Sequence, residues 1–218
     1  MEKIVLLSID DGTVWDKPLV ELLNRYGIPA TFNLNSGLED FVWEFQGQPV
    51  RRQHLADTVE QYRGHEVASH TLTHPRLDQL PPPRLRREAE EDAEALKAIF
   101  GLEEVGFAVP FTVCGQREVN ILRRYVRYIR LSEYARDFRL PEDPWHIPIH
   151  ALYNDEDIYE KLEAFAAWQG RGLFVIAGHS YELELLGHWE KFEALLRRLK
   201  DMDLRFMTTM DFVREFYP

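Results

Sequence analysis

Short runs typical of buried β-strands alternate with amphipathic helical patterns along the whole chain, and this alternation limits the fold more than any other feature. Strands separated by helices form parallel sheets with crossover helices. Seven or eight such units in 218 residues, with no linker between them, favour one α/β domain (1–218) built as a closed or nearly closed β/α barrel and not as an open sheet. Strands are expected at residues 4–9, 30–34, 66–69, 106–109, 128–131, 146–149, 173–177 and 205–208.

Helical patterns fill the intervals between these runs. Their clearest ends are Gly27 and Gly101, because glycine readily takes the left-handed conformation that ends a helix. In the longest loop-like stretch the aromatic residues Phe41, Trp43 and Phe45 alternate, which predicts a hairpin, a cover over a site, or simple packing on the barrel rim. Helices are expected at residues 17–26, 51–62, 83–100, 118–125, 155–168, 189–201 and 209–216.

Charge and cysteine content exclude several classes of protein. The formal net charge is −11, whereas nucleic-acid binding needs clustered positive charge, so no nucleic-acid partner is expected. The sequence has no run of 18 apolar residues, so no membrane span is expected. The single cysteine, Cys114, allows no intrachain disulfide and fits a reducing compartment. The first ten residues resemble a strand and not a signal peptide, which predicts a cytoplasmic location.

Two adjacent carboxylates, Asp10 and Asp11, follow the first predicted strand. In a β/α barrel the catalytic groups stand at the carboxyl ends of strands. Successive strand residues point to opposite faces, so these two need not share one role, and Gly12 lets the chain turn after them. Taken alone, the segment is equally typical of a turn with a helix-capping aspartate.

Two histidines, His70 and His74, follow the third predicted strand. They are four residues apart, so one helical turn would place both on one face. Neutral imidazole is a ligand that zinc and neighbouring divalent metals favour. With the upstream aspartates, this spacing predicts a divalent metal site, with zinc as the favoured ion.

A third polar site follows the strand at residues 173–177. In the sequence, His179 follows the apolar run and comes directly after Gly178. A histidine at a strand end can donate a proton to a leaving group. A buried, hydrogen-bonded histidine is the simpler interpretation when this segment is taken alone.

These three segments, in this order, resemble the polysaccharide deacetylase family, also called the NodB homology domain or carbohydrate esterase family four. The family's Thr-Phe-Asp-Asp-Gly motif is similar to residues 8–12, and its His-Ser/Thr-x-x-His motif is matched by residues 70–74. Its last motif, a strand that ends in Leu-x-His, is similar to residues 176–179. The resemblance covers residues 4–182 and implies a distorted β/α barrel of seven to eight strands.

The resemblance also implies a role for each matched residue. Asp11, His70 and His74 would hold the metal, Asp10 would be the general base, and His179 would be the general acid. The implied reaction is hydrolysis of an N-acetyl or related acyl group, with a small N-acylated sugar or amide as the substrate.

Two motifs depart from the family pattern. In the third, Arg-x-Pro-Tyr, Ala108 takes the arginine position and Phe111 takes the tyrosine position. A positive group beside the base is therefore expected to be missing, whereas the backbone N–H of Phe111 can still contact an oxyanion. In the blurred fourth motif, Asp143 and His146 are candidates to tune the acid, and Trp145 is expected mainly to pack.

Several further residues are candidates for the substrate pocket, although each could equally make local hydrogen bonds. They are Phe111, Asn33, Trp145, His150 and Glu182.

Three functions remain open at this point: a sugar deacylase, a hydrolase of another small amide of the cyclic imide or ureide type, and a metal-containing sugar-binding protein without turnover. Ala108 favours the last of these. The presence of both Asp10 and His179 argues against it, because binding alone needs neither a base nor an acid.

Overall fold

The computed structural model describes residues 2–111 and 113–218, and its centre is a nine-stranded sheet in which every pair of neighbours is parallel. The strands of this sheet are β1 (Lys3–Asp10), β2 (Thr31–Leu34), β5 (Glu66–Ser69), β6 (Phe107–Ala108), β7 (Ile129–Tyr134), β8 (Ile147–Ile149), β9 (Ala151–Leu152), β10 (Gly172–His179) and β11 (Arg205–Met207). Neighbours follow the order β8-β7-β6-β5-β2-β1-β10-β9, and β11 lies beside β1. A separate antiparallel hairpin joins β3 (Val42–Phe45) to β4 (Gln48–Arg51).

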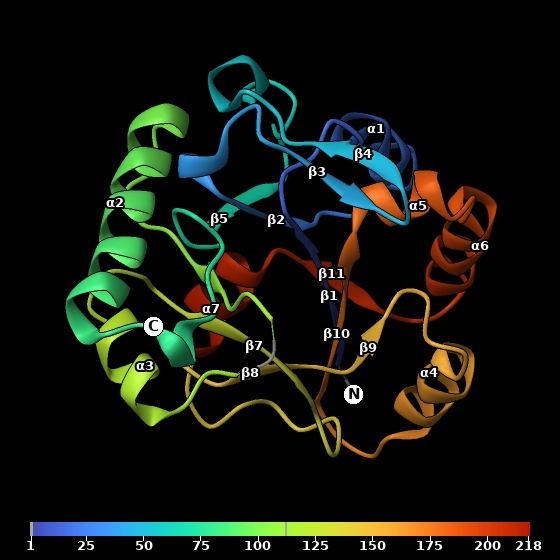
Figure 1. Cartoon of the computed structure of the whole chain (residues 1–218). Helices are drawn as coiled ribbons and strands as arrows, with labels where there is room; N and C mark the ends of the chain where they lie inside the picture. The colour runs from blue at the N-terminus through green and yellow to red at the C-terminus, as the bar shows by residue number, and fades with distance from the viewer. Residues whose placement is uncertain (1, 112) are drawn as a thin grey trace.

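Helices flank the strands on both sides. In Figure 1, α2 and α3 lie to one side, α4, α5 and α6 lie to the other, and the β3–β4 hairpin lies at the end of the molecule away from the N-terminus. No helix in the described part of the chain is long and apolar enough to cross a membrane. The helices are α1 (Asp16–Tyr26), α2 (Pro82–Phe100), α3 (Gln116–Leu122), α4 (Ile158–Ala167), α5 (Ser180–Leu185), α6 (Trp189–Lys200) and α7 (Thr209–Phe216), with short 3-10 turns at Ser36–Leu38, Leu55–Thr58 and Leu77–Gln79.

The two ends of the strand order, β8 and β9, are consecutive in sequence and are separated only by His150. The His150 backbone N–H donates to the Val175 carbonyl at 2.8 Å, and its Nδ1 accepts from the Val175 N–H at 3.0 Å. The chain itself therefore brings the two ends of the sheet together. This is the distorted, incomplete β/α barrel that the sequence predicts.

Alternation along β1 shows how the barrel is filled. Val5 and Leu7 belong to the core between sheet and helices, whereas Ile4 and Leu6 belong to the barrel interior. All eight residues of β1 are buried, as expected for a strand covered on both faces. The inner face continues to Ser8 and ends at Asp10, so the interior becomes polar at the carboxyl end.

All eight predicted strands are confirmed, and the hairpin is confirmed as one of the alternatives for the aromatic stretch. The predicted helix at residues 51–62 is wrong. An isolated bridge between Thr13 and Arg52 holds its start extended, and only a 3-10 turn follows at Leu55–Thr58. Strand β9 and helix α5 were not predicted, because β9 has only two residues and α5 has only six.

Candidate active site

The polar residues singled out in the sequence meet at the carboxyl ends of the strands. Asp10 ends β1 and lies in register with His179 of β10 on one side and Asn33 of β2 on the other. A cavity of about 360 Å³ opens there. Six of the predicted residues line it: Asp10, Asp11, His70, His74, Phe111 and His179.

Asp11, His70 and His74 form a cluster suited to a divalent metal. Their donor atoms all lie within 4.8 Å of one another. The Nδ1–H of His70 donates to the Ala108 carbonyl at 2.9 Å, which leaves Nε2 as the free nitrogen, an arrangement common in metal-binding histidines. Burial lowers the pKa of His70 to about 3, so the ring is neutral. One carboxylate and two neutral imidazoles are donors that zinc and similar ions accept.

The two histidines are brought together by a loop, so the predicted helical turn is wrong. Thr71 and His74 have positive φ values of 71° and 52°. Yet the two imidazole rings lie 4.9 Å apart between centroids. Thr73 anchors the loop by donating from its N–H and Oγ1 to Glu88 of α2, at 2.8 and 2.7 Å. Residues other than glycine rarely adopt positive φ, and they concentrate at functional sites.

Asp10 is held by a guanidinium that the sequence interpretation missed. Nη2 of Arg130, in β7, donates to both carboxylate oxygens of Asp10, at 2.5 and 2.6 Å, and both residues are buried. The expected absence of a positive group beside the base is therefore wrong. Ala108 lies in register with Arg130 on the neighbouring strand, and its small side chain leaves space for Arg130 to reach across. A lone arginine within the apolar run at residues 128–131 was the available signal.

Asn33 also contacts Asp10. Its Nδ2 donates to Asp10 Oδ1 at 2.7 Å, so Asn33 lies beside Asp10 and not among the cavity-lining residues. Burial raises the pKa of Asp10, but the charge and hydrogen bond of Arg130, together with the nearby histidines His70 and His179, outweigh this and bring the pKa below its ordinary value. Asp10 is therefore a carboxylate at neutral pH.

His179 lines the same cavity beside Asp11 of the metal cluster. Its Nε2 lies 3.8 Å from Asp11 Oδ2, and its Nδ1 lies 3.4 Å from Glu182 Oε1. Burial lowers the pKa of His179, but Glu182, Asp11 and Asp10 together raise it to about 9. His179 is thus an imidazolium at neutral pH, and Glu182 acts behind it without lining the cavity.

The β3–β4 hairpin packs behind one wall of the site. Arg52, directly after β4, donates from Nη2 to Asp11 Oδ1 at 2.8 Å, and its guanidinium lies 4.9 Å from the Trp43 ring centroid. Trp43 packs edge-on against Tyr181, which lines the cavity, at 5.5 Å. The hairpin thus fixes both a predicted metal ligand and a cavity wall, and Arg52 gave no signal in the sequence.

Three other candidates lie outside the cavity. Trp145 is half-buried against the core between sheet and helices. His146 pairs with Asp143 at 2.9 Å on the surface. His150 is occupied by Val175 at the barrel seam, and burial lowers its pKa to about 4.

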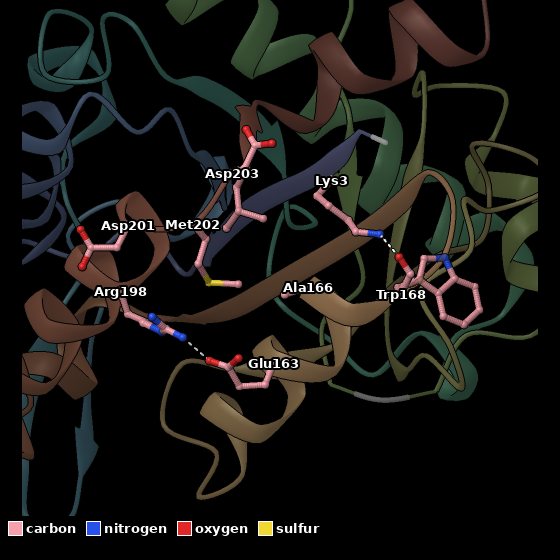
Figure 2. Close-up of a pocket in the computed structure, with 9 residues that line it drawn as sticks. Lys3, Glu163, Ala166, Trp168, Arg198, Asp201, Met202 and Asp203 are labelled. Carbon is pink, nitrogen blue, oxygen red and sulfur yellow. Dashed lines mark hydrogen bonds and ion pairs between the residues drawn. The ribbon is translucent and has the colours of Figure 1, made fainter.

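A second cavity, of about 410 Å³, lies at the opposite end of β1. Figure 2 shows its lining, in which Lys3 points to the Trp168 carbonyl and Arg198 pairs with Glu163. Lys3 also donates to the Gly170 carbonyl at 2.9 Å. These polar groups satisfy one another, and no metal-binding cluster of three ligands is found there among the described residues.

Solved structures of several hydrolases share this fold. One is the Xyl-CE4 domain of a multidomain xylanase from the hindgut metagenome of Trinervitermes trinervoides, which is 21% identical (TM-score 0.63, covering 99% of this chain and 91% of that one). A family 4 acetyl xylan esterase from Clostridium thermocellum, in complex with a cobalt ion, is 17% identical (0.65, 97% and 91%). The chitin deacetylase of Colletotrichum lindemuthianum is 18% identical (0.60, 95% and 86%).

At these identities the likeness shows the fold alone. The sequence itself carries the family assignment, because residues 1–126, more than half of the chain, match the polysaccharide deacetylase family. The same segment contains Asp10, Asp11 and both histidines of the loop. The chain therefore belongs to the polysaccharide deacetylase family.

Proposed function

We propose that this protein is a metal-dependent hydrolase that removes an N-acetyl or related acyl group from a sugar or sugar-like substrate. One observation carries the proposal: the carboxyl group of Asp10 and the imidazole of His179 line one cavity that also contains the three-donor cluster. A base and an acid around one electrophilic centre are what hydrolysis of an amide requires.

Asp11, His70 and His74 would hold the metal, with zinc as the favoured ion. A divalent ion there supplies Lewis acidity, which polarises the acyl carbonyl and acidifies water. One of the solved structures of similar fold is described in complex with a cobalt ion, which supports a divalent metal here.

The protein's own residues divide the proton transfers. Asp10 accepts the proton of the attacking water, and Arg130 and Asn33 keep its carboxylate oriented. His179 donates a proton to the departing nitrogen, for which its raised pKa keeps it charged. The Phe111 backbone, at the cavity edge, is the candidate contact for the oxyanion.

Two other functions are less well supported. A sugar-binding protein without turnover was favoured by Ala108, but the contact of Arg130 with Asp10 removes that argument. A hydrolase of cyclic imides or ureides would use the same residues, and its product would be a ring-opened acid without a released amine fragment.

A cytoplasmic location and a small soluble substrate complete the proposal. The single cysteine suits a reducing compartment, and a net charge of −11 gives no help in holding an anionic polymer. Cell fractionation, with assays on small N-acyl sugars and on insoluble chitin or peptidoglycan, tests both points. Faster release from insoluble glycan than from every small substrate would contradict them.

The central experiment combines metal analysis with an acyl-release screen. Purified protein is expected to hold one divalent ion per chain and to release acetate from an N-acetyl sugar or nucleotide sugar. His70→Ala and His74→Ala should each lose the ion, whereas His54→Ala, whose side chain is 48% exposed outside the cavity, should keep it. Unchanged metal content in both loop variants would defeat the assignment.

A further inference from the structure

Arg52 is a buried cation that makes more contacts beside the metal cluster than its ion pair with Asp11. Its side chain is only 6% exposed, and it follows directly after β4. Nη2 donates to the Asp11 carboxylate, and Nη1 donates both to the Asp11 backbone carbonyl and to Oδ1 of Asn35. One guanidinium therefore binds the main chain and the side chain of a predicted metal ligand at the same time.

Asn35 extends these contacts to the loop that carries both histidines. Its Nδ2 donates to the backbone carbonyls of His70 and Thr71, at 2.5 and 2.7 Å. Asn35 is only 3% exposed, and its Oδ1 accepts from Arg52. The predicted ligands lie on two separate segments of the chain, after β1 and after β5, and the pair of Arg52 and Asn35 joins these segments by hydrogen bonds.

The backbone that this pair holds is strained. Asp11 and Thr71 have positive φ values of 85° and 71°. Residues other than glycine keep such values only where the surrounding structure enforces them. The carbonyl of Asp11 accepts from Arg52, and the carbonyl of Thr71 accepts from Asn35. The hydrogen bonds of the pair thus fall on the residues whose conformation needs support.

The β3–β4 hairpin in turn holds Arg52. The Arg52 guanidinium lies 4.9 Å from the Trp43 ring centroid, and an isolated bridge pairs the Arg52 backbone with Thr13. Nε of Arg52 is buried without a hydrogen-bond partner in the described part of the chain. An unpaired buried donor costs stability, so the guanidinium is placed for its contacts beside the metal cluster and not for the largest number of hydrogen bonds.

We propose, building on the function above, that Arg52 is a positioning residue of the metal centre. It holds Asp11 and, through Asn35, the histidine loop in the geometry that binds a divalent ion, without itself touching the ion. Its positive charge alone would repel the ion, so its benefit comes from the planar fork of donors, which a lysine does not reproduce. Residues that orient metal ligands typically contribute about 10- to 100-fold to metal affinity.

The dissociation constants of Zn²⁺ and Co²⁺, measured by competition with a chelator, test this without turnover. Arg52→Met should weaken binding of both ions by about 10- to 100-fold. Arg52→Lys keeps the charge beside Asp11 and should recover the stability of the metal-free protein but only part of the affinity. Arg51→Met, at the neighbouring residue with a side chain 60% exposed, is the matched control and should bind as the wild type does.

The visible absorption spectrum of the Co²⁺-loaded protein adds a readout of ligand geometry. It should change in both Arg52 variants and stay as in the wild type in Arg51→Met. Binding as tight as in the wild type, tighter binding, or an unchanged spectrum in Arg52→Met would overturn the inference while the proposed function stands.

A second variant decides the matter if Arg52→Met does not fold. Asn35→Ala breaks the link to the histidine loop but leaves the ion pair of Arg52 with Asp11, so it should also weaken binding. Wild-type affinity in Asn35→Ala and in Arg52→Lys would overturn the inference. A wild type that binds the ions but hydrolyses no acylated sugar contradicts the proposed function alone, because the affinities still decide the role of Arg52. A wild type that binds neither ion contradicts both.

Discussion

The two ends of the barrel interior both bury carboxylates but treat them differently. At the amino end, Glu66 accepts hydrogen bonds from Thr31 Oγ1, Tyr128 OH and the Met210 N–H, at 2.8, 2.7 and 2.8 Å. At the carboxyl end, Asp10 and Asp11 are paired with guanidinium groups. Neutral donors do not offset the cost of burial, which raises the pKa of Glu66 to about 7. At Asp10, Arg130 and the nearby histidines together outweigh burial and bring the pKa below its ordinary value.

The two ends also differ in how completely their polar atoms are paired. Around the metal cluster, Asn33 Oδ1 and Arg52 Nε are buried without a hydrogen-bond partner among the described residues. Positive φ values at Asp11 and His74 add backbone strain in the same place. Unpaired groups and strain cost stability, so their presence at this end agrees with the active site proposed there. The amino end, by contrast, contributes stability.

The largest expected effect is on turnover, at the carboxyl end. Asp10→Asn should keep the metal but lower kcat/KM by about a hundred- to ten-thousand-fold, because the base is lost. Metal content and rate are measured on the same preparation, with Asp143→Asn, outside the cavity, as the control. A wild-type rate in Asp10→Asn would show that Asp10 is not the base.

Arg130→Met should affect both rate and stability. Removing one partner of a buried ion pair costs about 3–5 kcal/mol in the free energy of unfolding. Because Arg130 lowers the pKa of Asp10, its loss raises that pKa, and the acidic limb of the kcat/KM profile should move to higher pH.

Arg130→Lys, which keeps the charge, should move the acidic limb of the kcat/KM profile part of the way back toward its wild-type pH. An acidic limb that stays in place in Arg130→Met would mean that the arginine serves stability alone.

At the amino end, Glu66→Gln should change the pH dependence of stability and not the chemistry. The folded pKa of about 7 lies above the ordinary value of 4.5, so the folded state binds the extra proton. Stability from this group is present at acid pH and is lost as pH rises through 7, by about 3 kcal/mol at most. Urea unfolding at pH 5 and pH 8 should show that the free energy of unfolding of Glu66→Gln, relative to the wild type, is higher at pH 8 than at pH 5. The same change in the exposed control Glu90→Gln would contradict the assignment.

The smallest effect is expected at the cavity of Figure 2. Lys3→Met removes hydrogen bonds to the Trp168 and Gly170 carbonyls and should lower the free energy of unfolding by about 1–3 kcal/mol. Thermal denaturation measures this, and kcat/KM should stay at the wild-type value below the transition. A loss of turnover without a loss of stability in Lys3→Met would contradict the conclusion that the amino end of the barrel contributes only stability.

The sequence was most informative where a property repeats locally. Apolar runs placed all eight predicted strands, and polar residues directly after them placed Asp10, His70 and His179 at one end of the barrel. Where the pattern was weak, at residues 51–62, a bridge to Thr13 decided the conformation instead of helical periodicity.

What the sequence alone determined is the set of elements and the residues at their carboxyl ends, because burial of alternating side chains is a local requirement. Only the tertiary structure decided which side chains meet across strands. Arg130 lies 120 residues from Asp10 in sequence, yet β7 directs it across the space that Ala108 leaves open. Arg52 reaches Asp11 because a bridge to Thr13 holds the chain after the hairpin beside residues 11–13. Charge partners depend on strand order and side-chain volume, which no local pattern encodes.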